Sequence, residues 1–145
     1  MKLRIFKDFK ARLPRQQIEQ LFREVVRGEA EKGCRSDINL IFTGDAGIRG
    51  LNRQYRDKDK VTDVLSFVID GPASDGETFG EIYISVPAVR RQARSYGVTQ
   101  TEEYLRLVGH GLLHLFGYDH MAPEEAARMR QREQRYLDSA GGPRR

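Results

Sequence analysis

The segment HGLLHLFGYDH, residues 110–120, decides how the rest of this chain is expected to fold, and it contains all three histidines of the protein. His110 and His114 are four residues apart, so on a helix they share one face and their two imidazoles can bind one metal ion. In a continuous helix, His120 would lie roughly 15 Å along the axis from His110. Gly117 can end the helix, because glycine adopts the left-handed conformation, and His120 can then turn back to complete a set of three.

Three neutral imidazoles with an open fourth position describe a catalytic zinc site rather than a structural one. A helical pair of histidines, a glycine turn and a third histidine is also the arrangement of the metzincin proteases. Those proteases carry a glutamate general base directly after the first histidine, where this chain has Gly111. Incidental core or surface histidines are the alternative, which these spacings disfavour. The pattern therefore predicts one zinc ion per chain, bound by His110, His114 and His120.

The same eleven residues, 110–120, resemble the signature of the YbeY family, bacterial single-strand endoribonucleases of ribosomal RNA maturation. Two further segments are similar to motifs of that family: LNRQYRDKDKVTDVLSF at residues 51–67 and GEIYIS at residues 80–85. Val61 stands where proline is usual in the family, and Val68 where proline often follows Ser-Phe. Neither position carries chemistry, so these departures matter little. The resemblance covers most of the chain after residue 51, and the first fifty residues match only in general pattern.

This resemblance implies a hydrolase, a zinc-dependent endoribonuclease that cuts single-stranded RNA. It implies a role in 16S rRNA 3′-end processing, ribosome maturation and quality control. The functional arginine of the family falls on Arg56, and His114 is expected to be catalytic as well as metal-binding. The implied partners are single-stranded RNA, precursor rRNA and the ribosome, with ribosomal proteins or an assembly GTPase as further candidates. No specificity for DNA is expected.

Two other classes of function stay open from the sequence. One is a zinc hydrolase of another kind, such as a peptidase with metzincin-like geometry. Gly111 argues against this class because glycine cannot act as a base. The other is a non-catalytic ribosome-assembly factor with a structural zinc ion. A cage of three histidines with an open position argues against that class.

The polar residues around the histidines have more than one interpretation. Arg56 can bind phosphate oxygens through its planar fork, or it can form a surface ion pair with an aspartate of residues 57–63. RNA brings its own nucleophile, the 2′-hydroxyl, and the general base is open. Asp119 can orient a ligand imidazole or stabilise the turn, and Tyr118 is expected to pack rather than to act as an acid. Gly111 is expected to leave room for a bulky substrate.

Composition sets broad limits on the function. The chain is expected to form one YbeY-like domain over residues 1–145 with a hydrophobic core. Its net charge of +4 permits a phosphate-backbone partner without requiring one. Basic residues gather at 49–60, 90–94 and 128–135, either as RNA contacts or as solvated faces interleaved with acidic residues. With no membrane-length apolar run, no secretory signal and Cys34 as the single cysteine, the chain is expected to be cytoplasmic.

Apolar periodicity predicts an α+β fold: a small mixed β-sheet packed with helices around a central buried helix that carries the metal ligands. Apolar residues cover most of the circumference of residues 100–116, which is typical of a buried helix. Asp45 is expected to cap the helix at residues 45–55, with Tyr55 on its inner face, and residues 70–78 are expected to join two strands as a hairpin loop. The expected strands are residues 3–9, 37–43, 64–69 and 81–85, and the remaining helices are one from Pro14 that Gly33 ends, 87–96 and 124–137.

Overall fold

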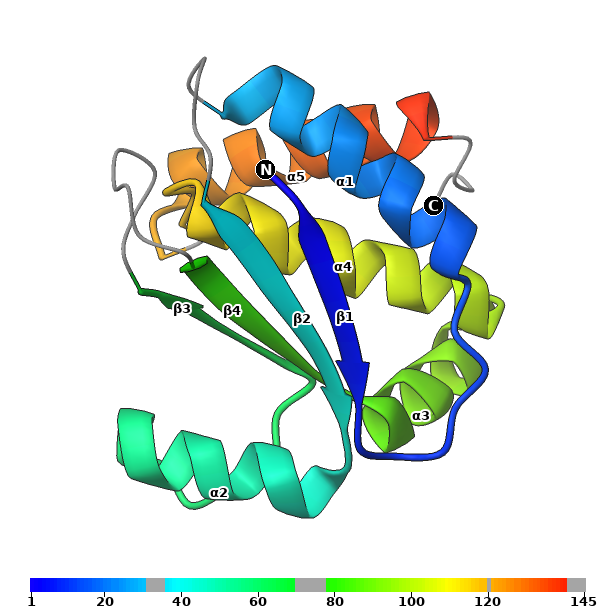
Figure 1. Cartoon of the computed structure of the whole chain (residues 1–145), viewed down its shortest axis with the longest axis vertical. Helices are drawn as coiled ribbons and strands as arrows, with labels where there is room; N and C mark the ends of the chain where they lie inside the picture. The colour runs from blue at the N-terminus through cyan, green and yellow to red at the C-terminus, as the bar shows by residue number, and fades with distance from the viewer. Residues whose placement is uncertain (31–35, 70–77, 120, 141–145) are drawn as a thin grey trace.

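A computed structural model describes residues 1–30, 36–69, 78–119 and 121–140 (Figure 1). Within these residues, strands and helices alternate in the first half of the chain, and two consecutive strands and three consecutive helices follow. The elements are β1 (Leu3–Lys7), α1 (Arg15–Glu29), β2 (Asp37–Thr43), α2 (Asp45–Arg56), β3 (Val64–Val68), β4 (Thr78–Ser85), α3 (Val86–Tyr96), α4 (Gln100–Leu115) and α5 (Pro123–Ser139).

The four strands form one mixed sheet in the order β1-β2-β4-β3. β1, β2 and β4 run parallel to one another, and β3 is antiparallel to β4. Side chains alternate between the two faces, so that Ile38, Leu40 and Phe42 of β2 are fully buried while the residues between them are partly exposed. The predicted hairpin of β3 and β4 is confirmed, although β4 begins at Thr78, before the predicted start.

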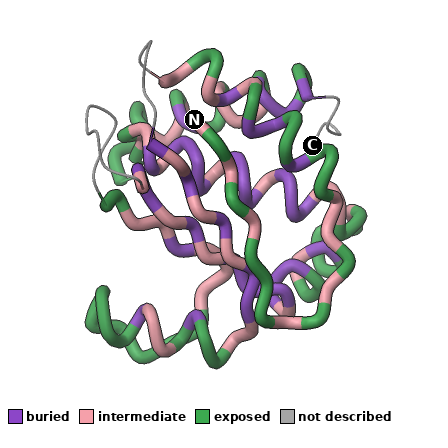
Figure 2. Tube along the Cα trace, viewed as in Figure 1, coloured by how far each residue is buried: buried purple, intermediate pink, exposed green. Residues whose placement is uncertain are grey.

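The helix α4 lies at the centre of the fold, in contact with α1, α3, α5 and the strands β3 and β4. Ten of its 16 residues are buried, because apolar side chains cover most of its circumference (Figure 2). Its first turn is capped by Thr99, whose hydroxyl accepts a hydrogen bond from the Glu102 amide at 3.0 Å. The helix ends at Leu115, and Gly117 follows in the left-handed region with a φ of 99°. The predicted central helix and the α+β fold are therefore confirmed.

Gly111 faces the sheet, and the expectation that it leaves room for substrate is wrong. A Cβ atom at this position would lie 2.8 Å from Cγ2 of Ile82 and 3.2 Å from Oγ of Ser66. The Ser66 hydroxyl also donates a hydrogen bond to the Gly111 carbonyl at 3.1 Å. The missing side chain therefore lets α4 approach β3 and β4 closely, and the helix position that holds the protease base is used for packing here.

Asp45 is the first residue of α2 rather than its N-cap, which is Gly44. Its carboxylate instead accepts hydrogen bonds from the Arg91 guanidinium at 2.7 and 3.2 Å and from the Ser85 hydroxyl at 2.7 Å. The hydrogen bonds from Arg91 lower the pKa of Asp45 below its ordinary value, against a smaller opposing effect of burial. The contact fixes the start of α2 against the junction of β4 and α3. The C-terminal end of α2 then lies beside β3.

Other differences from the predicted elements lie at their ends. β1 ends at Lys7, two residues before the predicted end. α1 ends at Glu29, and Gly33 and Cys34 lie outside the described residues. Tyr55 was expected on the inner face of α2, yet its side chain is 60% exposed. None of the described helices combines the length and the apolar composition needed to cross a membrane.

Candidate active site

His110 and His114 project from the same face of α4, one turn apart. Their Nε2 atoms are 3.1 Å apart, and the ring planes cross at 72°. Two nitrogens bound at 2.0–2.1 Å to one tetrahedral zinc ion lie about 3.3 Å from each other. The two rings therefore converge at nearly the separation that one metal ion requires. His120 lies outside the described residues, among which no group of three histidine, cysteine or carboxylate side chains could hold a metal ion.

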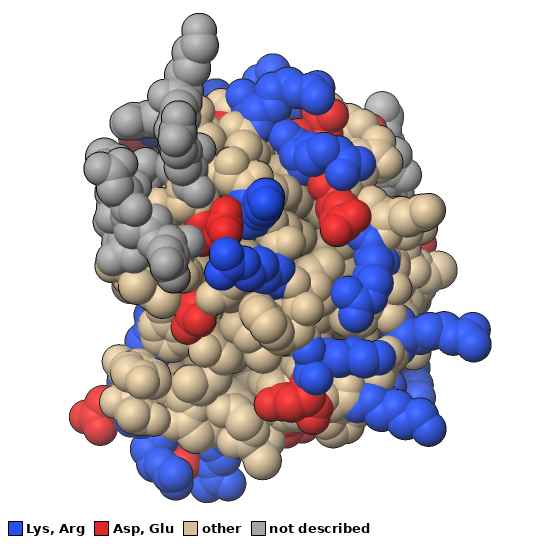
Figure 3. All heavy atoms as spheres, viewed as in Figure 1, with Lys and Arg blue, Asp and Glu red and all other residues tan. Residues whose placement is uncertain are grey.

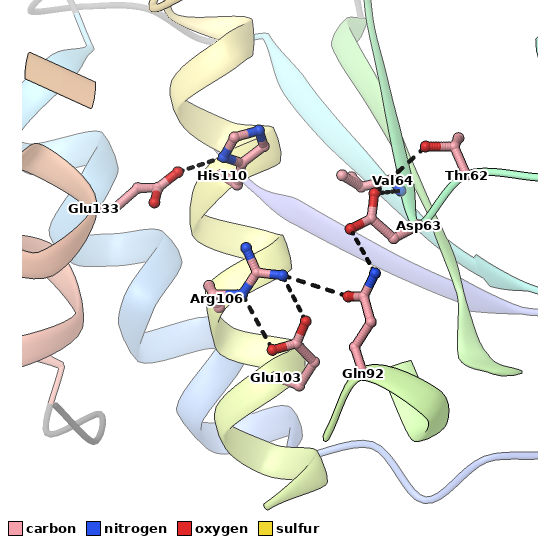
Figure 4. Close-up of polar contacts among 8 residues, drawn as sticks. All are labelled: Thr62, Asp63, Val64, Gln92, Glu103, Arg106, His110 and Glu133. Atoms are coloured by element: carbon pink, nitrogen blue, oxygen red, sulfur yellow. Dashed lines mark hydrogen bonds and ion pairs between the residues drawn. The ribbon is translucent and has the colours of Figure 1, made fainter. Parts of the chain in front are cut away.

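A carboxylate from the last helix contacts this pair. Glu133 of α5 pairs through Oε1 with Nδ1 of His110 (Figure 4). A carboxylate at Nδ1 favours the tautomer with the proton on that nitrogen, which leaves the lone pair of Nε2 available to a metal ion. Sequence reasoning gave Glu133 no role in the site. A carboxylate between the buried Met129 and Tyr136 was the signal that could have marked it.

The two histidines open into a cleft of about 470 Å³ between α4 and β3. One wall carries His110 and His114, and the other is formed by residues 62–66 and Val68. Arg56 also lines the cleft, although it belongs to α2. Three of the predicted site residues therefore share one cavity, although Arg56 is distant in the sequence from the two histidines.

Arg56 is the last residue of α2, where Asp57 in the left-handed conformation ends the helix. Its Nη2 atom donates a hydrogen bond to the Ser66 carbonyl at 2.8 Å, and its guanidinium lies 5.2 Å from the centre of the Phe67 ring. The alternative of an ion pair with a loop aspartate is not found within the described ranges, where Asp59 pairs with Arg49 at 2.7 Å. Among the described residues, Arg56 thus forms a hydrogen bond to a backbone carbonyl but no ion pair with a carboxylate.

Asp63 is the carboxylate of the cleft wall, and it is held from two sides. Its Oδ1 accepts a hydrogen bond from the Val64 amide at 2.8 Å, and its Oδ2 accepts one from Gln92 at 3.1 Å. Gln92 is in turn bound by Arg106 at 3.4 Å, which pairs with the fully buried Glu103 at 2.6 Å (Figure 4). This chain of contacts joins the first turn of α4 to the start of β3. It fixes the orientation of a carboxylate that sequence reasoning treated only as an ion-pair partner of Arg56.

Tyr118 and Asp119 lie in the turn that follows the C-terminal end of α4. Asp119 accepts a hydrogen bond from the Met121 amide at 3.2 Å, as expected of a turn-stabilising residue. Tyr118 packs partly buried against the core, in line with the expected packing role. Burial, and then a hydrogen bond with Glu29, raises the pKa of the Tyr118 hydroxyl above its ordinary value.

The basic side chains do not gather into one patch on the face shown in Figure 3, where Lys and Arg lie among Asp and Glu. Two members of the predicted basic stretches, Arg49 and Arg91, are paired with Asp59 and Asp45. Such pairing reduces the positive charge that these arginines offer to a phosphate backbone. Arg56 is therefore distinguished by its position in the cleft rather than by membership of a basic patch.

The profile of the family described as Endoribonuclease YbeY matches residues 5–141. The chain belongs to the YbeY endoribonuclease family. A YbeY protein of Pelotomaculum thermopropionicum is 44% identical over 119 residues, which cover 79% of this chain and 78% of that protein. One from Sulfurovum is 41% identical over 124 residues and 83% of each chain, and one from Listeria monocytogenes serotype 4a is 42% identical over 120 residues, 73% of this chain and 74% of its own. These YbeY relatives place the chain among the nuclease hydrolases.

The fold agrees with this family assignment. A protein of Thermotoga maritima with a known solution structure is 30% identical and superposes with a TM-score of 0.62, covering 95% of this chain and 88% of its own. The YbeY resemblance seen in residues 51–67 and 110–120 therefore extends over nearly the whole chain. Both motifs contribute to the cleft, the first through Arg56 and residues 62–66 and the second through the two histidines.

Proposed function

We propose that this YbeY protein is a zinc-dependent endoribonuclease that cuts single-stranded RNA in the cleft between α4 and β3. The observation that carries the proposal is the meeting of Arg56, His110 and His114 in one cavity. We further propose that residues 1–145 act as one domain in the cytoplasm, on precursor rRNA at the 3′ end of 16S rRNA. Its partners there are the ribosome and, as candidates, ribosomal proteins or an assembly GTPase.

The proposed metal ligands are His110, His114 and His120. Support comes from the 3.1 Å separation of the first two Nε2 atoms and from the carboxylate of Glu133 at Nδ1 of His110. Zinc held there would supply Lewis acidity toward a phosphoryl oxygen. The protein groups orient the ligands: α4 sets the spacing of the helical pair, and α5 brings Glu133 to the ring of His110.

In this proposal Arg56 binds the scissile phosphate and stabilises the charge that develops on its oxygens. Arginine has five N–H donors in a planar fork, and the structure uses one hydrogen bond, from Nη2 to the Ser66 carbonyl, to hold that fork at the cleft. The 2′-hydroxyl of the RNA is the candidate nucleophile, which explains a preference for RNA over DNA. Asp63, fixed by Val64 and Gln92, is the candidate proton acceptor among the described residues of the cleft.

A peptidase is the less favoured function because its base has no equivalent position in the fold. The residue after His110 is Gly111, which packs against Ile82 of the sheet. A longer side chain there would be directed into the core and not into the cleft. This packing and the family membership both favour RNA over a peptide as the substrate.

The proposal is tested with purified protein on single-stranded RNA, double-stranded RNA, single-stranded DNA and casein. We expect cleavage of single-stranded RNA only, loss of cleavage on treatment with a chelator, and recovery with zinc. His114→Ala should lose both the metal and the activity, because a site with three protein ligands has none to spare. Casein hydrolysis without RNA cleavage, or RNA cleavage that resists the chelator, would overturn the proposal.

A further inference from the structure

A second hollow lies on the opposite face of β3 from the cleft. It has a volume of about 320 Å³ and is bordered by Tyr55 of α2, Phe67 and Val68 of β3, and Glu81 of β4, among others. Phe67 and Glu81 are register partners in the hairpin, whereas the neighbouring Ser66 bonds to α4. Because successive strand residues point to opposite faces, this hollow lies on the outer face of the sheet.

The hollow and the cleft share one lining residue at the edge of the sheet. Val68 lines both cavities. Arg56 spans the same edge, since its Nη2 atom bonds the Ser66 carbonyl and its guanidinium lies over the Phe67 ring at 5.2 Å. A strand of RNA whose phosphate contacts Arg56 can therefore place its next nucleotide over the outer face of β3.

The walls of the hollow are aromatic and partly open to solvent. Tyr55 is 60% exposed as a residue, and its ring contacts that of Phe67 edge-on, with the ring centroids 5.5 Å apart. Phe67 in turn meets Tyr83 at 5.9 Å. Nucleobases of single-stranded RNA are held by stacking on such exposed aromatic rings, where loss of one ring weakens binding roughly tenfold. An exposed aromatic side chain beside the proposed phosphate-binding arginine is the arrangement that base stacking requires.

A carboxylate decides which part of a nucleotide fits the hollow. Glu81 is held there by hydrogen bonds from Asn39 at 3.2 Å and from the Tyr83 hydroxyl at 2.9 Å. A carboxylate only accepts hydrogen bonds and repels a phosphate group. The edge of a base with adjacent N–H donors is complementary to it. Guanine offers such a pair, whereas adenine and cytosine each offer one amino group, and uracil places carbonyl oxygens on both sides of its single N–H.

We infer that this hollow is a nucleobase subsite, in which a base next to the scissile phosphate stacks on Tyr55 and donates hydrogen bonds to Glu81, with guanine as the preferred base. This inference rests on the proposed ribonuclease function. It adds a specificity-determining surface to a cleft that otherwise recognises phosphate and metal alone. The subsite lies on α2 and the hairpin, apart from the histidine pair, so it can be altered without touching the metal ligands.

The test measures KM and kcat on short single-stranded RNA oligonucleotides in which each nucleotide near the cleavage position is made abasic in turn. Tyr55→Ala should raise KM roughly tenfold on intact RNA, and Tyr55→Phe should keep the wild-type value. At one position the abasic substrate should abolish the difference between Tyr55→Ala and wild type, because the interaction is already missing. Glu81→Gln should reduce the preference for guanine at that same position.

The matched control is Phe6→Ala, which removes an aromatic residue that is 50% exposed on β1, at the other edge of the sheet from the hollow. It should leave KM unchanged. An unchanged KM in Tyr55→Ala, or an equal loss on every abasic substrate, would overturn the subsite while RNA cleavage by the wild type still stands. Absence of RNA cleavage by the wild type would instead remove the proposed function itself.

Discussion

Glu133 on α5 contacts Nδ1 of His110 on α4, so the last described helix reaches the histidine pair directly. Partners of this kind fix the ring orientation of a metal-binding histidine, and their loss weakens metal binding about 10- to 100-fold. The contact also explains why a glutamate occupies a partly buried position between apolar residues of α5. The C-terminal helix is therefore a part of the site and not only a cover for the core.

Glu133→Gln should weaken zinc binding about 10- to 100-fold while the protein remains folded. Competition with a chromophoric chelator measures the affinity, and the absorption spectrum of the cobalt-substituted protein reports the geometry of the site. Glu125→Gln, at an exposed position in the first turn of the same helix, is the control and should behave like wild type. Equal affinities in both variants would show that Glu133 does not orient His110.

Arg56→Glu should abolish RNA cleavage, because the cleft would then present a negative charge to the phosphate. Arg56→Lys should also be impaired, since a point charge cannot make a two-pronged contact. Zinc content and melting temperature should stay near wild type in both. Arg53→Glu changes an exposed arginine of the same helix and serves as the control for charge alone. Full activity in Arg56→Glu would remove this residue from the site.

Gly111→Ala should lower the free energy of unfolding by about 1–3 kcal/mol, because the added methyl group overlaps Ile82. Gly109→Ala is the matched control two residues earlier in α4. A Cβ there would lie at an ordinary 3.7 Å from Leu21, so this change should be neutral or stabilise the helix by about 0.5–1 kcal/mol. Urea denaturation measures both values. A neutral Gly111→Ala would show that the approach of α4 to the sheet does not depend on glycine.

Asp45→Asn should reduce stability at neutral pH by about 0.2–1 kcal/mol, the usual range for a largely exposed ion pair. The hydrogen bonds from Arg91 lower the pKa of Asp45 in the folded state below 3.8, so the folded state binds its proton less readily than the unfolded chain. The contribution is therefore complete well above that value and is lost as the pH falls through the lowered pKa. Urea midpoints of variant and wild type, measured from about pH 7 down to about pH 3, should converge at the acidic end. A constant difference would contradict the assignment.

The central helix and its histidine pair were predictable because both follow from local spacing. The apolar residues around α4 specify burial on most sides, and the spacing of four positions from His110 to His114 places the two rings on one face of the helix. The left-handed Gly117 was likewise predictable from its residue type. His120 stays a predicted ligand, since it lies outside the described residues.

What could not be predicted depends on how elements cross in space. Glu133 reaches His110 only because α5 packs against α4. The residue spacing within either helix does not predict that the two helices pack together. The close approach at Gly111 depends on the distance between α4 and the sheet. Tyr55 has the helical spacing of an inward residue, but α2 covers only part of the sheet and leaves the ring exposed. The pattern of residues predicts which face of a helix is apolar, but the tertiary contacts determine which element packs against that face.

β3 is an edge strand of the sheet, and the guanidinium of Arg56 donates a hydrogen bond to the carbonyl of Ser66 in this strand. Strands in this position offer unpaired backbone groups to other chains, and positive side chains are one means by which proteins block such pairing. We therefore expect the arginine proposed to bind phosphate also to hinder pairing of this strand with another copy of the chain. Inactive variants at Arg56 should accordingly form more oligomers at high concentration than variants at the histidines, which leave this border of the sheet protected.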